Sequence, residues 1–383
     1  MRRFLYRGVV LLALCSPPAL SQPSATRASS WTFTIEQRYG DTPGTELADP
    51  RTLAVDGAGR LYVGDTRPPS VKVFNRDGTL LRIIGRQGGG PGEYRSPWIA
   101  ARGGRVVVHD PAQSRTSVFD TSGTFLRDWT SFCCHQNEIA IDREFRVVVP
   151  AIMQSPTAAQ SLSVRRIPYV RFAIDDGHVV DTIQIRAAGE ERLWTVPRRG
   201  SDGKPGTGTT SVTIPFTPRQ LFAWDPSGGY VSGWSATFRL FRSTRGTDSS
   251  QVVSQRASSR RIPDELRRAQ ADSAIASLTA MVGPQVAGNA VRLSDVPTDA
   301  PAFTRLLIDE QGNIWARQLV GAERGKTAFR VFAPNGTDLG EAILPAQVPD
   351  WGGVAFGAGT IFVRTEDADG QPVVLRIRVA RAG

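Results

Sequence analysis

The chain has 383 residues, of which 40% are hydrophobic and 21% charged, and its formal net charge is +10. These proportions are ordinary for a globular protein. All but three of the 46 basic residues are arginines, and they are scattered along the chain. This distribution excludes the dense basic arm typical of a nucleic-acid-binding protein, and it leaves open a weak attraction to anionic envelope polymers. No apolar run approaches the roughly 20 residues that a membrane span needs, so we expect none.

The first 21 residues have the order of a secretory signal peptide. Arg2, Arg3 and Arg7 precede a short apolar run at 9–14, and small residues follow up to Ser21, after which we expect cleavage. This pattern predicts that the protein is periplasmic or secreted.

Cys15 raises an alternative in which the cysteine is lipidated after cleavage. Leu14 immediately before it is bulky, whereas that processing needs a small residue there. We therefore expect a chain that is exported without a lipid anchor.

A repeated phrase organises the rest of the chain. Residues 53–65 read as strand, Asp-Gly turn and strand, and a similar phrase ends 45 residues later at Asp110. Second hairpins follow at 73–82 and 118–127, with turns at Asp77-Gly78 and Ser122-Gly123. Two hairpins per repeat give four strands, which is one blade of a β-propeller.

Four weaker copies of the phrase complete the series. The six turns lie at positions 56, 101, 142, 225, 309 and 356. Two of the spacings are nearly double the others, so each long interval holds either an insertion or a degenerate blade. We favour insertions, one at about 187–217, which is loop-like in composition, and one at about 257–300. Within the second, residues 263–283 have the start and stop signals of a helix, which we expect to pack on the propeller.

The ends of the chain appear together in the last repeat. The sixth copy supplies three evident strands, at 354–356, 360–364 and 373–379. Residues 31–37 occupy the position of an outermost strand just before the first copy. The sequence therefore predicts an all-β, six-bladed propeller over 31–380, with four-stranded blades, one short helical insertion and an N-terminal strand that closes the last blade.

The phrase resembles the repeat of NHL-type six-bladed propellers of exported bacterial proteins. The resemblance rests on 50–65, 71–85 and Pro91-Gly92, is close over 49–129 and is patchy beyond. Such propellers include binding scaffolds, and related six-bladed folds include metal-dependent lactonases and an amidating lyase with metal ligands around the central channel. No complete ligand set transfers to this sequence, and one fold hosts many functions.

The expected ligand-binding face carries the loops between second and third strands and the links between blades, because both lie on one face. On it we place six candidate residues near the channel mouth, with no metal site. They are Asp65, Arg67, Tyr94, His109, Asp110 and Arg115. Asp65 and Asp110 recur at one blade position, so hydrogen bonding at a strand end is the alternative role for both.

Histidine and cysteine are scarce. Three histidines would suffice for zinc, but His109, His135 and His178 occupy different repeat positions and are not expected to converge. The adjacent Cys133 and Cys134 are expected to be structural, as a vicinal disulfide or as thiols, with soft-metal binding or redox chemistry as the alternative.

The sequence thus predicts a monomeric, non-catalytic binding scaffold without a cofactor. Its ligand would be a protein, an envelope glycan or a small molecule. The alternative is a hydrolase or lyase with calcium or zinc in the central channel.

Overall fold

A computed structural model describes residues 31–132, 138–151, 166–199, 205–244, 249–255, 260–321 and 323–381. The expected signal peptide, the Cys133-Cys134 pair and His135 lie outside the described residues.

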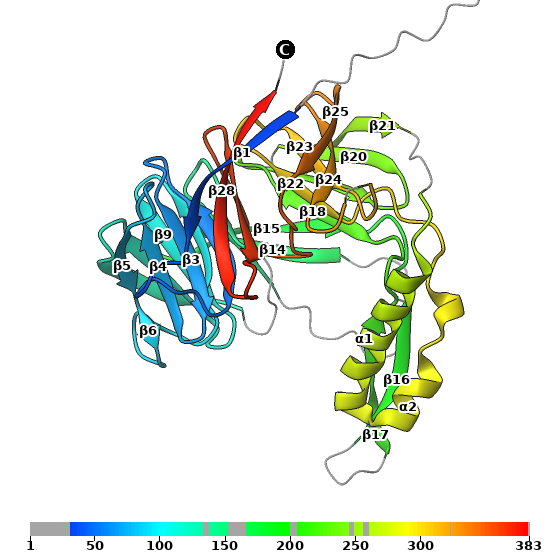
Figure 1. Cartoon of the computed structure of the whole chain (residues 1–383). Helices are drawn as coiled ribbons and strands as arrows, with labels where there is room; N and C mark the ends of the chain where they lie inside the picture. The colour runs from blue at the N-terminus through cyan, green and yellow to red at the C-terminus, as the bar shows by residue number, and fades with distance from the viewer. Residues whose placement is uncertain are drawn as a thin grey trace, which may run out of the picture.

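Six four-stranded antiparallel sheets form the body of the molecule (Figure 1). The first two blades contain β2 (Pro50–Val55), β3 (Leu61–Thr66), β4 (Pro69–Phe74) and β5 (Leu80–Ile84), then β8 (Trp98–Arg102), β9 (Arg105–Asp110), β10 (Arg115–Asp120) and β11 (Phe125–Thr130). The next two contain β12 (Ala140–Ile141), β13 (Arg146–Pro150), β14 (Arg166–Ala173) and β15 (Val179–Arg186), then β18 (Gln220–Trp224), β19 (Tyr230–Trp234), β20 (Phe238–Ser243) and β21 (Ser250–Gln255).

The fifth blade contains β22 (Arg305–Ile308), β23 (Ile314–Arg317), β24 (Thr327–Phe332) and β25 (Asp338–Leu344). The sixth contains β26 (Val354–Gly357), β27 (Thr360–Glu366), β28 (Pro372–Arg381) and, from the other end of the described chain, β1 (Trp31–Tyr39). The first strands of the blades form an inner ring, because β2 contacts β8 and β26, β8 contacts β12, and β18 contacts β22. The predicted six-bladed propeller is confirmed.

The turn aspartates explain why the repeated phrase folds into a hairpin. One carboxylate oxygen of Asp309 accepts the N–H groups of residues 311 and 313, and the other accepts the indole N–H of Trp315 at 2.9 Å. Asp142 accepts equivalent backbone bonds, although Phe145 stands in its turn where glycine is usual. Phe145 adopts a φ of 56°, so this turn keeps the left-handed conformation that Gly312 supplies elsewhere.

The last blade closes as predicted. Strand β1 pairs antiparallel with β28, from Trp31 opposite Arg381 to Tyr39 opposite Val374. The ring of Trp31 lies 5.0 Å from that of Trp315 in the fifth blade, and its indole N–H donates to the carbonyl of Leu339. The N-terminal strand therefore covers the edge of β28, completes the last blade and packs on the neighbouring one.

The two long intervals of the repeat hold an appended unit. It consists of β16 (Leu193–Arg199), β17 (Pro205–Thr213), α1 (Asp264–Val282), α2 (Pro284–Ala290) and the short 3₁₀ helix η2 (Leu293–Asp295). Trp194 and Val196 of the hairpin share a buried cluster with Leu278 and Val282 of α1. The helix was expected to pack on the propeller, and instead its buried side faces this hairpin, because the two insertions supply each other with an apolar partner.

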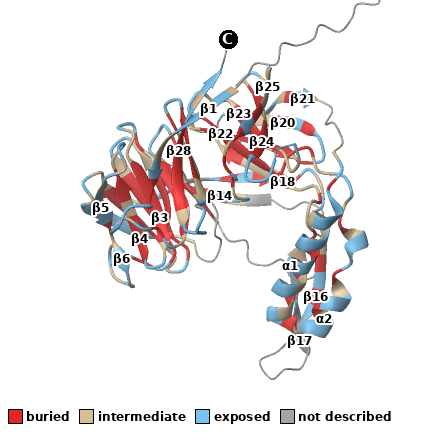
Figure 2. Cartoon of the chain, in the orientation of Figure 1, coloured by how far each residue is buried: buried red, intermediate tan, exposed pale blue. Residues whose placement is uncertain are grey.

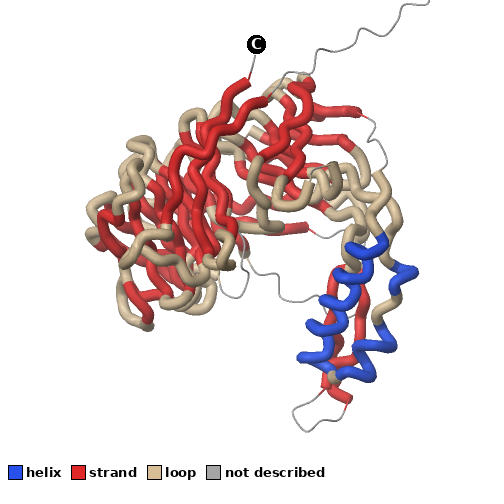
Figure 3. The backbone as a smooth tube through the Cα atoms, viewed as in Figure 1, coloured by secondary structure: helices blue, strands red, loops and turns tan. Residues whose placement is uncertain are grey.

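The loops divide into two faces. We call the face with the second-to-third-strand loops and the links between blades the connector face, and the opposite one the turn face. Both insertions are links between blades, and in Figure 1 they project to the same side as β6 (Arg86–Gln87), a short strand in the first link that pairs with β7 (Glu93–Tyr94). Helices in the described chain are confined to the appended unit (Figure 3), whose outer surface is exposed (Figure 2).

Candidate ligand-binding face

Asp65 anchors the link that enters the first blade. Its side chain is fully buried at the end of β3, where the carboxylate accepts the N–H groups of Ala48 at 3.0 Å and Asp49 at 2.8 Å. The ammonium group of Lys72 lies 3.1 Å from the same carboxylate and balances its charge. A carboxylate held in this way fixes the backbone and is closed to solvent.

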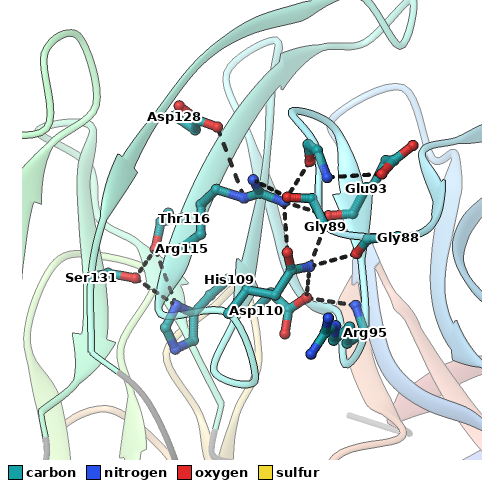
Figure 4. A network of polar contacts seen from close by, with 12 residues as sticks. Gly88, Gly89, Glu93, Arg95, His109, Asp110, Arg115, Thr116, Asp128 and Ser131 are labelled. Atoms are coloured by element: carbon teal, nitrogen blue, oxygen red, sulfur yellow. Dashed lines mark hydrogen bonds and ion pairs between the residues drawn. The ribbon is translucent and has the colours of Figure 1, made fainter.

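Asp110 repeats this arrangement one blade later. Its carboxylate accepts the N–H group of Arg95 at 2.6 Å (Figure 4). It also accepts the N–H group of Ala112 at 3.0 Å and the side-chain amide of Gln113 at 2.7 Å. The geometry gives both aspartates the strand-end role, and they position the connectors that lead into the first two blades.

Arg115 holds the glycine-rich link between these blades. Its guanidinium donates to the carbonyl oxygens of Gly89 at 3.1 Å, Gly90 at 2.6 Å and Glu93 at 2.7 Å (Figure 4). The Gln113 amide donates to the carbonyl of Gly88 at 3.1 Å. These bonds fix a loop whose composition alone would make it flexible.

Tyr94 and His109 are buried within the same region. Burial raises the pKa of the Tyr94 phenol, whose oxygen has no hydrogen-bond partner among the described residues. Burial also lowers the pKa of His109 to about 4, and the charge of the neighbouring Asp110 opposes this shift. The His109 Nδ1 atom lies 3.1 Å from the Thr116 hydroxyl and 3.2 Å from that of Ser131 (Figure 4). Neither ring reaches solvent, so neither can contact a ligand directly in this conformation.

A recess of about 670 Å³ opens between the first two blades on the connector face. It lies between the loop that joins β3 to β4 and the anchored link. Its lining residues are Thr66, Arg67, Pro68, Pro69, Gln87, Gly88, Gly89 and Arg95. Of the six predicted residues only Arg67 lines it, while Asp65, Asp110 and Arg115 hold its walls. Gln87 and Arg95 were not among the predicted residues, although the links between blades, one of which contains Gln87, were expected on this face.

Charged residues at the start of the inner strands gather at the channel mouth. Arg305, the first residue of β22, is 5% exposed and donates to the carbonyls of Pro349 at 2.8 Å and Gly352 at 3.0 Å. Its guanidinium also lies 2.5 Å from the carboxylate of Glu138, which precedes the third blade. Burial lowers the pKa of Arg305, and the Glu138 carboxylate opposes this shift. The pair joins the third and fifth blades across the channel.

The link into the sixth blade covers this mouth. Asp350 forms an ion pair with Arg317, and although burial raises the pKa of Asp350, the neighbouring guanidinium outweighs it and the net shift is downward. Trp351 is 51% exposed and stacks on Trp98 of the second blade, with 5.7 Å between ring centroids. The guanidinium of Arg51 lies 5.9 Å from the Trp351 ring. No local sequence pattern indicates these contacts, because they join residues far apart in the chain.

Metal-ligating side chains do not assemble in the described part of the chain, where no group of three or more His, Cys, Asp or Glu residues could hold an ion. His109 lies inside the second blade, whereas His178 lies in the β14–β15 turn on the opposite face. The channel-mouth carboxylates Glu138 and Asp350 each pair with an arginine. A calcium or zinc site therefore has no ready ligand set among these residues.

Comparison with known proteins supports the fold. The chain matches no protein-family profile and, at a significant level, none of the curated proteins. Similar solved structures include a Bacteroides fragilis protein named as a candidate exported protein, with a TM-score of 0.50, 10% identity and coverage of 93% of this chain and 96% of that one. Another is a virginiamycin B lyase of Staphylococcus aureus, with a TM-score of 0.45, 10% identity and coverage of 92% of this chain and 100% of that one. A third is a gluconolactonase of Xanthomonas campestris, with a TM-score of 0.41, 11% identity and coverage of 92% of this chain and 90% of that one.

At 10% identity the likeness to the Bacteroides fragilis protein concerns the fold alone. The NHL resemblance stays a prediction. Among the described helices none is both long and apolar enough to cross a membrane.

Proposed function

We propose that this protein is an exported, NHL-like propeller that acts as a non-catalytic binding scaffold, with its ligand held on the connector face. Export is supported by the basic, apolar and small-residue order of the first 21 residues. Loops held on a rigid scaffold commonly carry binding function.

The observation that carries the proposal is the recess between the first two blades. Its walls are fixed by Asp65, Asp110 and Arg115, so the surface is organised before any ligand arrives. Preorganised walls reduce the entropy that binding must overcome. At the channel mouth, in contrast, the charged groups Arg305 and Glu138 satisfy each other.

A screen for ligands with a blocking variant tests the proposal. The full chain would be screened by thermal shift against defined saccharides, peptides and organic acids, and positive compounds measured by calorimetry. Gln87→Trp places an indole in the recess, and Arg143→Trp places one at an exposed position in a turn of the opposite face.

We expect at least one compound to bind without turnover, and Gln87→Trp but not Arg143→Trp to weaken it at least tenfold. Compounds unaffected by Gln87→Trp would contradict the proposal. Hydrolysis of gluconolactone that depends on stoichiometric metal would favour the enzymatic alternative.

A further inference from the structure

We propose that the recess binds an oxyanion, the carboxylate or phosphate group of a larger ligand. The inference rests on the proposed function and names the chemistry of the group that the connector face recognises. It starts from the lining, in which Arg67 and Arg95 are the charged residues and no carboxylate takes part.

The carboxylates around the recess are committed to other partners. Asp49 lies 2.9 Å from a terminal nitrogen of Arg51 and 3.0 Å from its Nε, and accepts the Thr66 hydroxyl at 2.6 Å. The Nε of Arg67 is 3.7 Å from Asp49, beyond hydrogen-bonding distance, and the Arg67 side chain is 75% exposed. The Arg67 guanidinium thus makes a long ion pair but no hydrogen bond with Asp49, and its N–H donors can turn to a ligand.

Arg95 is available in the same way. Its backbone N–H is fixed by Asp110, whereas no group in the described ranges accepts a hydrogen bond from its guanidinium. The remaining nearby carboxylate, Glu93, lies 2.9 Å from Arg86 and accepts the N–H of Gly90 at 2.8 Å. The recess is therefore lined by the Arg67 guanidinium, which has only one long ion pair, and by the Arg95 guanidinium, which has no acceptor in the described ranges.

The backbone of the link adds one donor and withholds two acceptors. The carbonyls of Gly88 and Gly89 accept from Gln113 and Arg115, so they are not available to a ligand. In a trans peptide the N–H points opposite to the carbonyl. The Gly89 N–H therefore points away from Gln113, and no described group accepts from it.

Guanidinium forks and free backbone N–H groups match the geometry of carboxylate and phosphate oxygens. A cation would meet two positive charges beside this loop, and the Gly88 and Gly89 carbonyls already accept hydrogen bonds. The volume of about 670 Å³ exceeds what a single oxyanion fills, which is why the anion is assigned as one group of a larger molecule.

Calorimetry of the full chain with inorganic phosphate and with citrate tests the inference. The variants are Arg67→Gln, Arg95→Gln and their combination, with Arg143→Gln on the turn face as the matched control. We expect each recess variant to weaken binding about tenfold, the combination to weaken it further, and the control to leave it unchanged. The tighter of the two probes identifies phosphate or carboxylate as the recognised group.

Two results would overturn the inference. One is failure of both anions to bind, and the other is equal weakening by Arg143→Gln, which would show a general charge effect. If a neutral compound binds and is lost in Gln87→Trp while neither anion binds, the binding-scaffold proposal stands and the oxyanion inference fails. If an anion binds through Arg67 and Arg95 but a metal-dependent turnover is found, the non-catalytic proposal fails and the oxyanion inference stands.

Discussion

The Arg305–Glu138 pair gives the sharpest test of whether the channel mouth is a structural closure. The variants are Glu138→Gln, Arg305→Met and the two together. Glu138→Gln removes the counter-charge but leaves the guanidinium its carbonyl acceptors at Pro349 and Gly352. Arg305→Met removes the charge and keeps an apolar stem of similar length.

The magnitude follows from the unequal burial of the two partners. Breaking a fully buried ion pair by removing one partner costs about 3–5 kcal/mol, whereas an exposed pair contributes about 0–1 kcal/mol. The Arg305 side chain is 7% exposed and that of Glu138 is 42% exposed. We therefore expect Glu138→Gln to lower the free energy of unfolding by about 2 kcal/mol, and the double-mutant cycle to give a coupling of about 1–2 kcal/mol.

Urea unfolding followed by tryptophan fluorescence measures these values, and Arg86→Met supplies the control. Arg86 pairs with Glu93 but is 83% exposed, so its loss is expected to change stability by less than about 0.5 kcal/mol. A coupling near zero would refute the reasoning. So would a Glu138→Gln variant of normal stability that loses ligand binding, because the carboxylate would then serve function.

Two further predictions concern the region around the recess. Gly85→Ala is expected to lower the free energy of unfolding by about 2–4 kcal/mol, because Gly85 has a φ of 71° and an added Cβ would lie 2.1 Å from the Tyr94 ring. In Gly89→Ala the atom nearest to the added Cβ lies 3.8 Å away, so the free energy of unfolding is expected to change by less than about 0.5 kcal/mol. Equal urea midpoints for the two variants would contradict the described link. Because the pKa of His109 falls from 6.5 in the unfolded chain to about 4 in the folded one, the unfolded state binds the extra proton, and stability is expected to decline by about 3 kcal/mol as pH falls from 6.5 to 4. His109→Leu should remove this part of the pH dependence, and an unchanged slope would show that the imidazole is not buried in its neutral form.

The fold was predictable because its determinants are local. An aspartate that binds the N–H groups two and four residues ahead marks each hairpin wherever it occurs, as at Asp142 and Asp309. The helix at 263–283 was predictable for the same reason. Its packing partner was not, because the β16–β17 hairpin lies some 50 residues away and carries no matching pattern.

The candidate site was predictable only in its location. The link between the first two blades was expected on the ligand-binding face, and it forms a wall of the recess there. The roles of the individual residues were not predictable. The sequence does not show that the side chains of Asp110 and Arg115 bind backbone groups, whereas the guanidinium of Arg95 has no acceptor in the described ranges. The channel-mouth contacts depend on ring closure and join residues far apart in the chain, such as Arg305 and Glu138, which are 167 positions apart.

Amide hydrogen exchange shows directly whether the ligand is held in the recess on the connector face. The full chain would be compared with and without the screened compound that gives the largest thermal shift. We expect added protection at the amides of 66–67 and 87–89 and none at the turn around Arg143. Protection confined to the turn face, or to 349–353 at the channel mouth, would contradict it.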